Sequence, residues 1–284
     1  MKTAYVFAGQ GAQYPGMGRD LYEKYPEAKA VFDAAGDRIK QLCFEGTAEQ
    51  LKETENTQPC VYTMTMAAYE AFRAALKASG EAEGAEPYAM AGFSLGEYSA
   101  MTAAGIITDI KTGTELMENR GRWMGEAGRD EDGNAAGTMA AAIGDKEKVL
   151  EIVEETRNGD ILITEKSAAI NTGSAVPVYS NLTAAPLSEY KADGSCAGDG
   201  AQAVEDIADA MAKQLMSPVR WVEIVKRLID EGVDTFIEFG PGKTLCGLVK
   251  KTDRKAKVYN VENCETLEST IKGIKEAVEA ENAQ

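Results

Sequence analysis

The sequence predicts an α/β fold built on a mainly parallel β-sheet. Short apolar segments alternate with longer segments of helical composition along the 284 residues, an order typical of strands joined by crossover helices. Two of the apolar segments, 87–92 and 235–239, run directly into glycine-flanked turns, as strands of such a sheet do before a helix. With 44% hydrophobic and 27% charged residues, the composition is that of a globular protein with a full core.

The first part of the chain predicts two strand-turn-helix units with a helix between them. Apolar residues 3–8 precede the turn Gly9-Gln10-Gly11, and a helix is expected over about 20–35. A run rich in Ala, Met and Leu follows Pro59, which predicts a helix over 59–78 with proline in its first turn. The strand at 87–92 then leads through Ser94 into a helix over 95–105.

The rest of the chain continues the alternation. Helical composition marks the segments at about 112–127, 146–156, 203–216 and 219–231. Short apolar segments that predict strands lie at 139–143, 161–164, 176–180 and 235–239. Two loops rich in glycine and acidic residues, 128–137 and 191–201, are expected as exposed insertions.

Composition also excludes several classes of function. A net charge of -16 argues against nucleic acid as a partner. The chain has no histidine, which excludes a Ser-His or Cys-His mechanism carried by this chain alone. Its five cysteines form no C-x-x-C pair, so no metal site is expected and a reduced, cytoplasmic protein is. Without an apolar run of 18 residues, no membrane span is expected.

The segment Gly92-Phe93-Ser94-Leu95-Gly96 fits the G-x-S-x-G pattern between a strand and a helix. Flanking glycines allow a sharp turn that exposes the serine oxygen and aims the Leu95 N–H, at a helix N-terminus, toward an incoming carbonyl. This predicts a nucleophilic serine. The alternative is a tight turn in which Ser94 merely caps the helix.

With this motif the chain resembles the malonyl-CoA:acyl carrier protein transacylase family over residues 3 to about 275. The segments that carry the resemblance are FAGQGAQ at 7–13, TQP at 57–59, GFSLGEYSA at 92–100, Arg120-Gly121, PVYSNLTA at 177–184, QLMSPVRW at 214–221 and EFGPGKTLCGLVK at 238–250. The resemblance implies an α/β-hydrolase-like large domain with a small ferredoxin-like subdomain.

The resemblance also implies a reaction. Ser94 would take a malonyl group from malonyl-CoA and pass it to the phosphopantetheine thiol of acyl carrier protein, in fatty acid biosynthesis. Backbone N–H groups of Gln10 and Leu95 would form the oxyanion hole, and Gln58 would line the same pocket. The backbone carbonyl of Gln214 would orient the histidine base. Malonyl-CoA enters as substrate, and no cofactor is implied.

Arg120 has support that does not depend on the resemblance. Leu116, Arg120, Trp123 and Ala127 share one helical stripe, whereas Arg122 points to the other side. A guanidinium on an apolar stripe needs a partner, and the free carboxylate of a malonyl group would provide a bidentate one. The alternative is a structural ion pair with an Asp or Glu side chain.

Two glycine turns allow a phosphate-binding alternative. A strand followed by Gly9-Gln10-Gly11 is compatible with a dinucleotide site, but Tyr14 occupies the third glycine position of G-x-G-x-x-G. Gly240-Pro241-Gly242 is more typical of a plain strand-to-helix turn.

The chain departs from the family pattern at the base. Members usually carry His at the position of Phe93 and a second His, the general base, upstream of PVYSN. Here only four residues separate Asn171 from Val176, and several dozen residues of the usual pattern are missing. We therefore expect a large domain of 1–135 and 176–284, with 136–175 a truncated ferredoxin-like remnant.

Two functions follow, an acyltransferase of impaired activity and a non-catalytic protein that binds acyl carrier protein or coenzyme A. The motifs favour the first and the absence of histidine favours the second. Both accommodate a basic patch on this acidic chain, which would dock an acidic carrier protein or is simply a solvated helix face. The patch includes Lys243, Lys250, Lys251 and Arg254.

Overall fold

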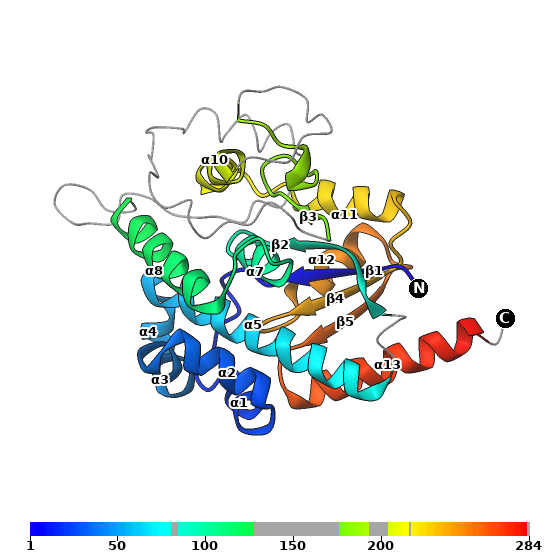
Figure 1. The fold of residues 1–284 in the computed structure, drawn as a ribbon, viewed down its shortest axis with the longest axis horizontal. Helices are drawn as coiled ribbons and strands as arrows, with labels where there is room; N and C mark the ends of the chain where they lie inside the picture. Colours follow the sequence, from blue (N-terminus) through cyan, green and yellow to red (C-terminus); the bar gives the residue numbers. More distant parts are fainter. Residues whose placement is uncertain (81–84, 128–175, 193–203, 216, 283–284) are drawn as a thin grey trace.

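A five-stranded parallel sheet forms the centre of the molecule (Figure 1). The computed structural model describes residues 1–80, 85–127, 176–192, 204–215 and 217–282. The strands, in spatial order, are β3 (Val178–Tyr179), β2 (Pro87–Gly92), β1 (Thr3–Phe7), β4 (Thr235–Phe239) and β5 (Lys257–Val261). Every neighbouring pair is parallel, which confirms the predicted fold class.

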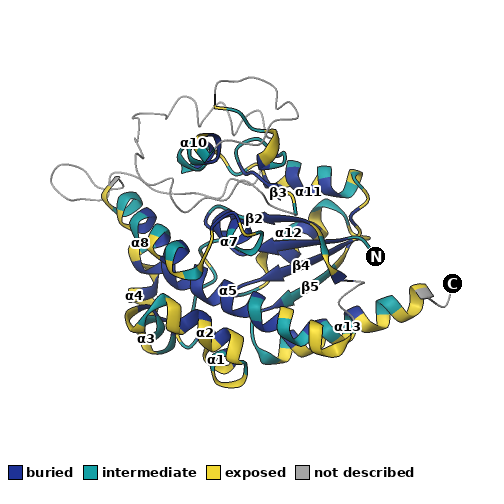
Figure 2. Ribbon diagram, in the orientation of Figure 1, coloured by how far each residue is buried: buried dark blue, intermediate teal, exposed yellow. Residues whose placement is uncertain are grey.

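Helices cover both faces of the sheet, and alternate residues of β1 divide between two apolar layers. Tyr5 and Phe7 pack into a core that includes α5 (Thr54–Ser79), while Ala4 and Val6 face a second core that includes α11 (Trp221–Asp230). All five residues of β1 are buried (Figure 2). A strand buried on both faces is expected when helices cover a parallel sheet on each side.

The remaining helices lie around this frame. They are α1 (Arg19–Lys24), α2 (Pro26–Ala35), α3 (Asp37–Glu45), α4 (Ala48–Lys52), α7 (Gly96–Ala103), α8 (Ile110–Ala127), η2 (Leu187–Glu189), α10 (Val204–Leu215), α12 (Thr244–Thr252) and α13 (Cys264–Asn282). None in the described part of the chain is long and apolar enough to cross a membrane.

Two prolines act differently from the prediction. The single helix expected over 20–35 is two helices, because Pro26 forces the extended conformation on Tyr25 (φ -113°, ψ 117°), where α1 ends. The helix expected from Pro59 begins earlier, at Thr54, and includes the proline. It starts there because the N–H groups of Asn56 and Thr57 bond to the Glu53 carbonyl.

The strand expected over 176–180 is shorter, since only Val178–Tyr179 pairs with β2. The expected elements at 139–143, 146–156 and 161–164 lie outside the described residues. The same holds for the loop at 128–137, for most of the loop at 191–201 and for the proposed small subdomain 136–175. The division of the chain into domains therefore stays a prediction.

Candidate functional site

Ser94 lies at the carboxyl edge of the sheet, between β2 and α7. Its φ of 53° lies in the left-handed region, which non-glycine residues seldom adopt. The flanking glycines make this turn possible. A Cβ at Gly92 would lie 1.9 Å from the Gly96 carbonyl, and one at Gly96 would lie 2.1 Å from the Phe7 carbonyl oxygen. The sharp turn predicted from G-x-S-x-G is therefore present, and no larger residue fits at either glycine.

The side chain of Asn181 holds this turn together. Its Oδ1 accepts a hydrogen bond from the Ser94 N–H at 2.7 Å, and its Nδ2 donates to the Gly92 carbonyl at 2.6 Å. One amide thus satisfies a donor and an acceptor on either side of the strained residue. Asn181 follows β3 and is 1% exposed, so this part of the chain directly supports the elbow, the sharp turn formed by residues 92–96.

Five hydrogen bonds connect the polar side chains beside Ser94. Arg120 Nη2 on α8 donates to Ser94 Oγ at 3.2 Å and to Gln214 Oε1 on α10 at 3.4 Å. Arg120 Nη1 also donates to Gln58 Oε1 on α5. Gln58 Nε2 in turn donates to Gln10 Oε1 at 2.7 Å, and Gln214 Nε2 donates to the Ser94 carbonyl at 2.8 Å. Residues from three helices, from the turn that holds Ser94 and from the turn that follows β1 (the β1 turn) therefore meet at one point.

Arg120 is a buried cation whose hydrogen-bond acceptors are all neutral. It is 3% exposed, whereas Arg122 on the same helix is exposed, as the stripe predicted. Within the described residues no carboxylate lies within ion-pair distance of it, and its Nε has no acceptor. Burial lowers the pKa of the guanidinium. The Tyr98 ring, 5.3 Å from the guanidinium carbon, gives partial compensation.

The resemblance assigned two backbone N–H groups, those of Gln10 and Leu95, to an oxyanion hole. Among the described residues no acceptor bonds to the N–H of Gln10 or of Leu95. The β1 turn is packed on the elbow, since a Cβ at Gly9 would lie 2.6 Å from the Phe93 carbonyl oxygen. Both segments thus lie beside Ser94 with a free donor each.

Gln214 enters the site through its side chain. Its backbone carbonyl accepts the Ser217 N–H at 3.3 Å, while its side-chain amide contacts Ser94 and Arg120. The resemblance implied a role for the carbonyl, so the side-chain contacts are an addition that the sequence did not indicate.

Glu97 is a buried carboxyl group that the sequence analysis did not single out. It lies on α7 and is 3% exposed. Its Oε2 accepts hydrogen bonds from Gln214 Nε2 at 3.0 Å and from the Asn181 N–H at 3.1 Å. Burial raises the pKa of Glu97 to about 7, against the opposing effect of those donors and of Arg120. Both Asn181 and Glu97 lie within the segments that carry the resemblance, and these segments were the only feature of the sequence that could have indicated a role for them.

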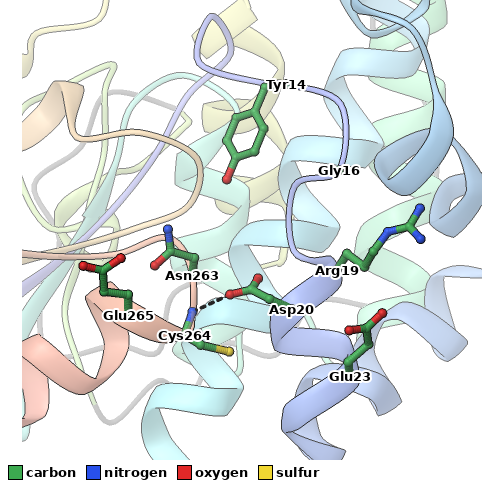
Figure 3. A pocket seen from close by; sticks show the side chains of 8 residues that line it. All are labelled: Tyr14, Gly16, Arg19, Asp20, Glu23, Asn263, Cys264 and Glu265. Atoms are coloured by element: carbon green, nitrogen blue, oxygen red, sulfur yellow. Dashed lines mark hydrogen bonds between the residues drawn. The ribbon is translucent and has the colours of Figure 1, made fainter.

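A hollow that Ser94 does not line lies near the carboxyl end of β5 and is unsuited to an acyl-CoA. It has a volume of about 580 Å³ and is lined by Tyr14, Gly16, Arg19, Asp20, Glu23, Asn263, Cys264 and Glu265. Figure 3 shows the Arg19 side chain directed away from the others and Asp20 bonded to the Cys264 N–H, at 2.7 Å. Three of these eight residues are acidic and one is basic, so the lining carries net negative charge, which disfavours phosphate groups. In the described residues no cluster of His, Cys, Asp or Glu is arranged to hold a metal ion.

Comparison with known proteins identifies relatives along the whole chain. The acyl transferase domain family matches residues 4–154. A malonyl CoA-acyl carrier protein transacylase of Bacillus subtilis (strain 168) is 34% identical, over 97% of this chain and 98% of the relative. One of Staphylococcus aureus (strain MRSA252) is 30% identical over 94% and 97%. The Bacillus alignment runs over 319 positions, more than the 284 residues here, so that relative contains residues this chain lacks.

Solved structures agree with the sequence relatives. A malonyl CoA-acyl carrier protein transacylase from Clostridium perfringens ATCC 13124 has a TM-score of 0.74 and 27% identity, over 99% of this chain and 100% of that one. A malonyl-transacylase in complex with a type II PKS acyl-carrier protein has a TM-score of 0.68 and 27% identity, over 96% and 100%.

Proposed function

Because the chain belongs to the malonyl CoA-acyl carrier protein transacylase family, we propose that it transfers a malonyl group from malonyl-CoA to the phosphopantetheine thiol of acyl carrier protein, in fatty acid biosynthesis. The observation that carries the proposal is Arg120, a buried cation with neutral partners whose Nη2 donates to Ser94 Oγ. A buried charge without a carboxylate partner is costly. A substrate that brings its own carboxylate to the nucleophile supplies that partner.

The reaction divides into two acyl transfers at Ser94. In the first, Ser94 Oγ attacks the thioester carbonyl, an O–C bond forms and the C–S bond to coenzyme A breaks, and the serine proton leaves with the thiolate as free thiol. In the second, the sulfur of the carrier thiol attacks the acyl-serine ester, an S–C bond forms, the O–C bond to Ser94 breaks, and the thiol proton returns to Ser94 Oγ. The free N–H groups of Gln10 and Leu95 are the donors we assign to the oxyanion.

Ser94 has no histidine base in this chain. Loss of the base in a comparable serine hydrolase lowers kcat by up to about 10⁶. We infer that acylation is slow, and that Arg120 supplies the available activation by donating to Oγ, which favours the ionised oxygen.

Mass spectrometry of the intact protein tests this function. After incubation with malonyl-CoA, wild type is expected to gain one malonyl group slowly, and Ser94→Ala is expected to gain none. Fast, stoichiometric labelling would contradict the inferred lack of a base. No labelling after long incubation, together with tight binding of malonyl-CoA, would favour the second candidate.

That second candidate is a protein that binds acyl carrier protein or coenzyme A without turnover. The absence of histidine favours it. It retains the Arg120 pocket and differs only in lacking an acyl-Ser94 intermediate, so the same labelling experiment separates the two.

For the carrier protein we propose a docking surface formed by α12 and the residues that flank it. Lys243, Lys250, Lys251 and Arg254 are all exposed, and none forms an ion pair within the described residues. Since β4 and β5 are parallel, α12 runs from the carboxyl edge of the sheet back to the amino edge. Lys243 therefore lies at the same edge as Ser94, and the other three lie toward the opposite edge. We assign direct contact near the site to Lys243 and long-range attraction to the others.

A further inference from the structure

Glu97 has no role in the reaction proposed above, yet its carboxyl group is deeply buried beside the site. Its Oε2 contacts Gln214 Nε2 and the Asn181 N–H, and both of those residues contact Ser94. A buried carboxyl is retained against a desolvation cost of several kcal/mol. Its position between Gln214 and Asn181, which both contact Ser94, indicates that it orients one or both of them.

The amide of Gln214 has two ends with opposite hydrogen-bonding character, and its surroundings accept only one orientation. Oε1 accepts from Arg120 Nη2, while Nε2 donates to the Ser94 carbonyl and to Glu97. A reversed amide would place its NH2 against the guanidinium and its oxygen against Glu97 and the Ser94 carbonyl. Because an ionised carboxylate can only accept, Glu97 opposes the reversed orientation.

We propose that Glu97 is a positioning residue that fixes the Gln214 amide, and through it holds the Arg120 guanidinium on Ser94 Oγ. The inference rests on the proposed function only for the identity of the ligand that Arg120 receives. Gln10 orients the Gln58 amide in the same way on the opposite side of the guanidinium. Its Oε1 accepts a hydrogen bond from Gln58 Nε2, so that Gln58 Oε1 faces Arg120 Nη1 and accepts from it. The cation is thus held between two glutamine amides, each oriented by a further acceptor.

The variant that tests this is Glu97→Gln, studied at pH 8, where the wild-type carboxyl is mostly ionised. The substitution keeps the shape of the side chain, but its NH2 group can donate to a reversed Gln214, so residue 97 no longer opposes the reversed orientation. Ser99→Ala is the matched control, since Ser99 is buried on the same helix and its Oγ has no partner within the described residues. Glu97→Asp, which withdraws the carboxylate by one methylene, is a second variant.

The first readout needs no ligand. The Nε–H signal of Arg120 in a ¹H–¹⁵N spectrum, assigned by its loss in Arg120→Lys, is expected to shift and broaden in Glu97→Gln and Glu97→Asp and to stay unchanged in Ser99→Ala. Gln214→Met removes the amide that connects Glu97 to Arg120, and it should shift the Arg120 signal in the same way. Adding Glu97→Gln to that variant should shift the signal no further. An unchanged Arg120 signal in both Glu97 variants overturns the proposal, whether or not the chain transfers malonyl groups.

The second readout is ligand affinity by calorimetry. We expect Glu97→Gln to raise the Kd of malonyl-CoA about tenfold, the equivalent of one charge-assisted hydrogen bond, with acetyl-CoA within about twofold of wild type. Equal weakening of both ligands would overturn the positioning role in favour of a general structural one. If wild type itself does not prefer malonyl-CoA, the proposed function fails, and the Arg120 signal alone then decides the role of Glu97.

Discussion

A carboxyl group buried as deeply as Glu97 makes the stability of the protein depend on pH. Its pKa is raised from 4.5 to about 7, mainly by burial, and Arg120 on α8 is the charged group that faces it. Between these values the native state binds a proton that the unfolded state has lost. The free energy of unfolding therefore falls as pH rises through this range, by roughly 3 kcal/mol in all, since one unit corresponds to about 1.4 kcal/mol.

Glu97→Gln should remove this pH dependence. Relative to wild type, we expect the variant to gain about 2 to 3 kcal/mol of unfolding free energy between pH 5 and pH 8. Urea denaturation at the two pH values measures it. Glu238, whose pKa burial also raises, is present in both proteins, so its contribution cancels. A constant difference between the variants at all pH values would show that Glu97 does not titrate in this range.

Arg120→Ala should weaken malonyl-CoA binding by roughly 2 to 4 kcal/mol, because hydrogen bonds to charged groups each contribute about 1.5 to 3 kcal/mol without being additive. Acetyl-CoA, which has no free carboxylate, should bind nearly as before. Calorimetric titration with both ligands is the measurement, with Arg122→Ala, exposed on the same helix, as control. Equal weakening of both ligands would favour a structural role for Arg120.

Single residues of the site differ in how far the sequence reveals them. Ser94 and Arg120 are predictable because G-x-S-x-G and the helical stripe are local patterns. Asn181 and Glu97 are not, because their role arises from contacts with residues 84 to 117 positions away. No local periodicity encodes such contacts, so these two residues are included only in the sequence segments that carry the resemblance.

At the scale of elements, the turn between β2 and α7 depends on the segment that follows β3. Asn181→Ala would leave the part-buried Ser94 N–H and the buried Gly92 carbonyl without their partner. We expect a loss of about 2 to 4 kcal/mol in unfolding free energy, at about 1 to 3 kcal/mol for each unsatisfied group. Urea denaturation tests this against Asn119→Ala, whose lost bond to Arg122 is exposed. A loss no larger than that of the control would mean that water replaces the amide.

The sequence indicated a helix after Gly240-Pro241-Gly242 without giving its bounds, and α12 has nonlocal support at its start. α12 has Gly247 in its interior and no side-chain cap of its own at Lys243. Its first N–H groups are instead satisfied from β4, where Glu238 accepts from Leu245 at 3.0 Å and from Cys246 at 2.7 Å. β1, β2 and β4 were predicted within a residue or so because a short apolar run is itself a local signal.

For the whole molecule, net charge and its distribution set how an acidic partner approaches. A chain of net charge -16 repels an acidic carrier protein except where cations are unpaired. Lys243→Glu and Lys255→Glu change the net charge equally, but only Lys243 lies at the edge with Ser94. We expect Lys243→Glu to weaken carrier binding more, and rising salt to reduce the difference. Equal effects of the two variants, measured by calorimetry, would show that contact is elsewhere.

The order of strands in the sheet has a consequence for synthesis on the ribosome. β1 is the first strand made, yet it occupies the middle of the sheet, between β2 and β4. Its second neighbour, Thr235–Phe239, is translated more than two hundred residues after it. A nascent chain that stops short of residue 235 therefore has one side of its central strand without backbone partners, and such an edge promotes association with other chains. Completion of the native sheet must wait until β4 and then β5 have emerged.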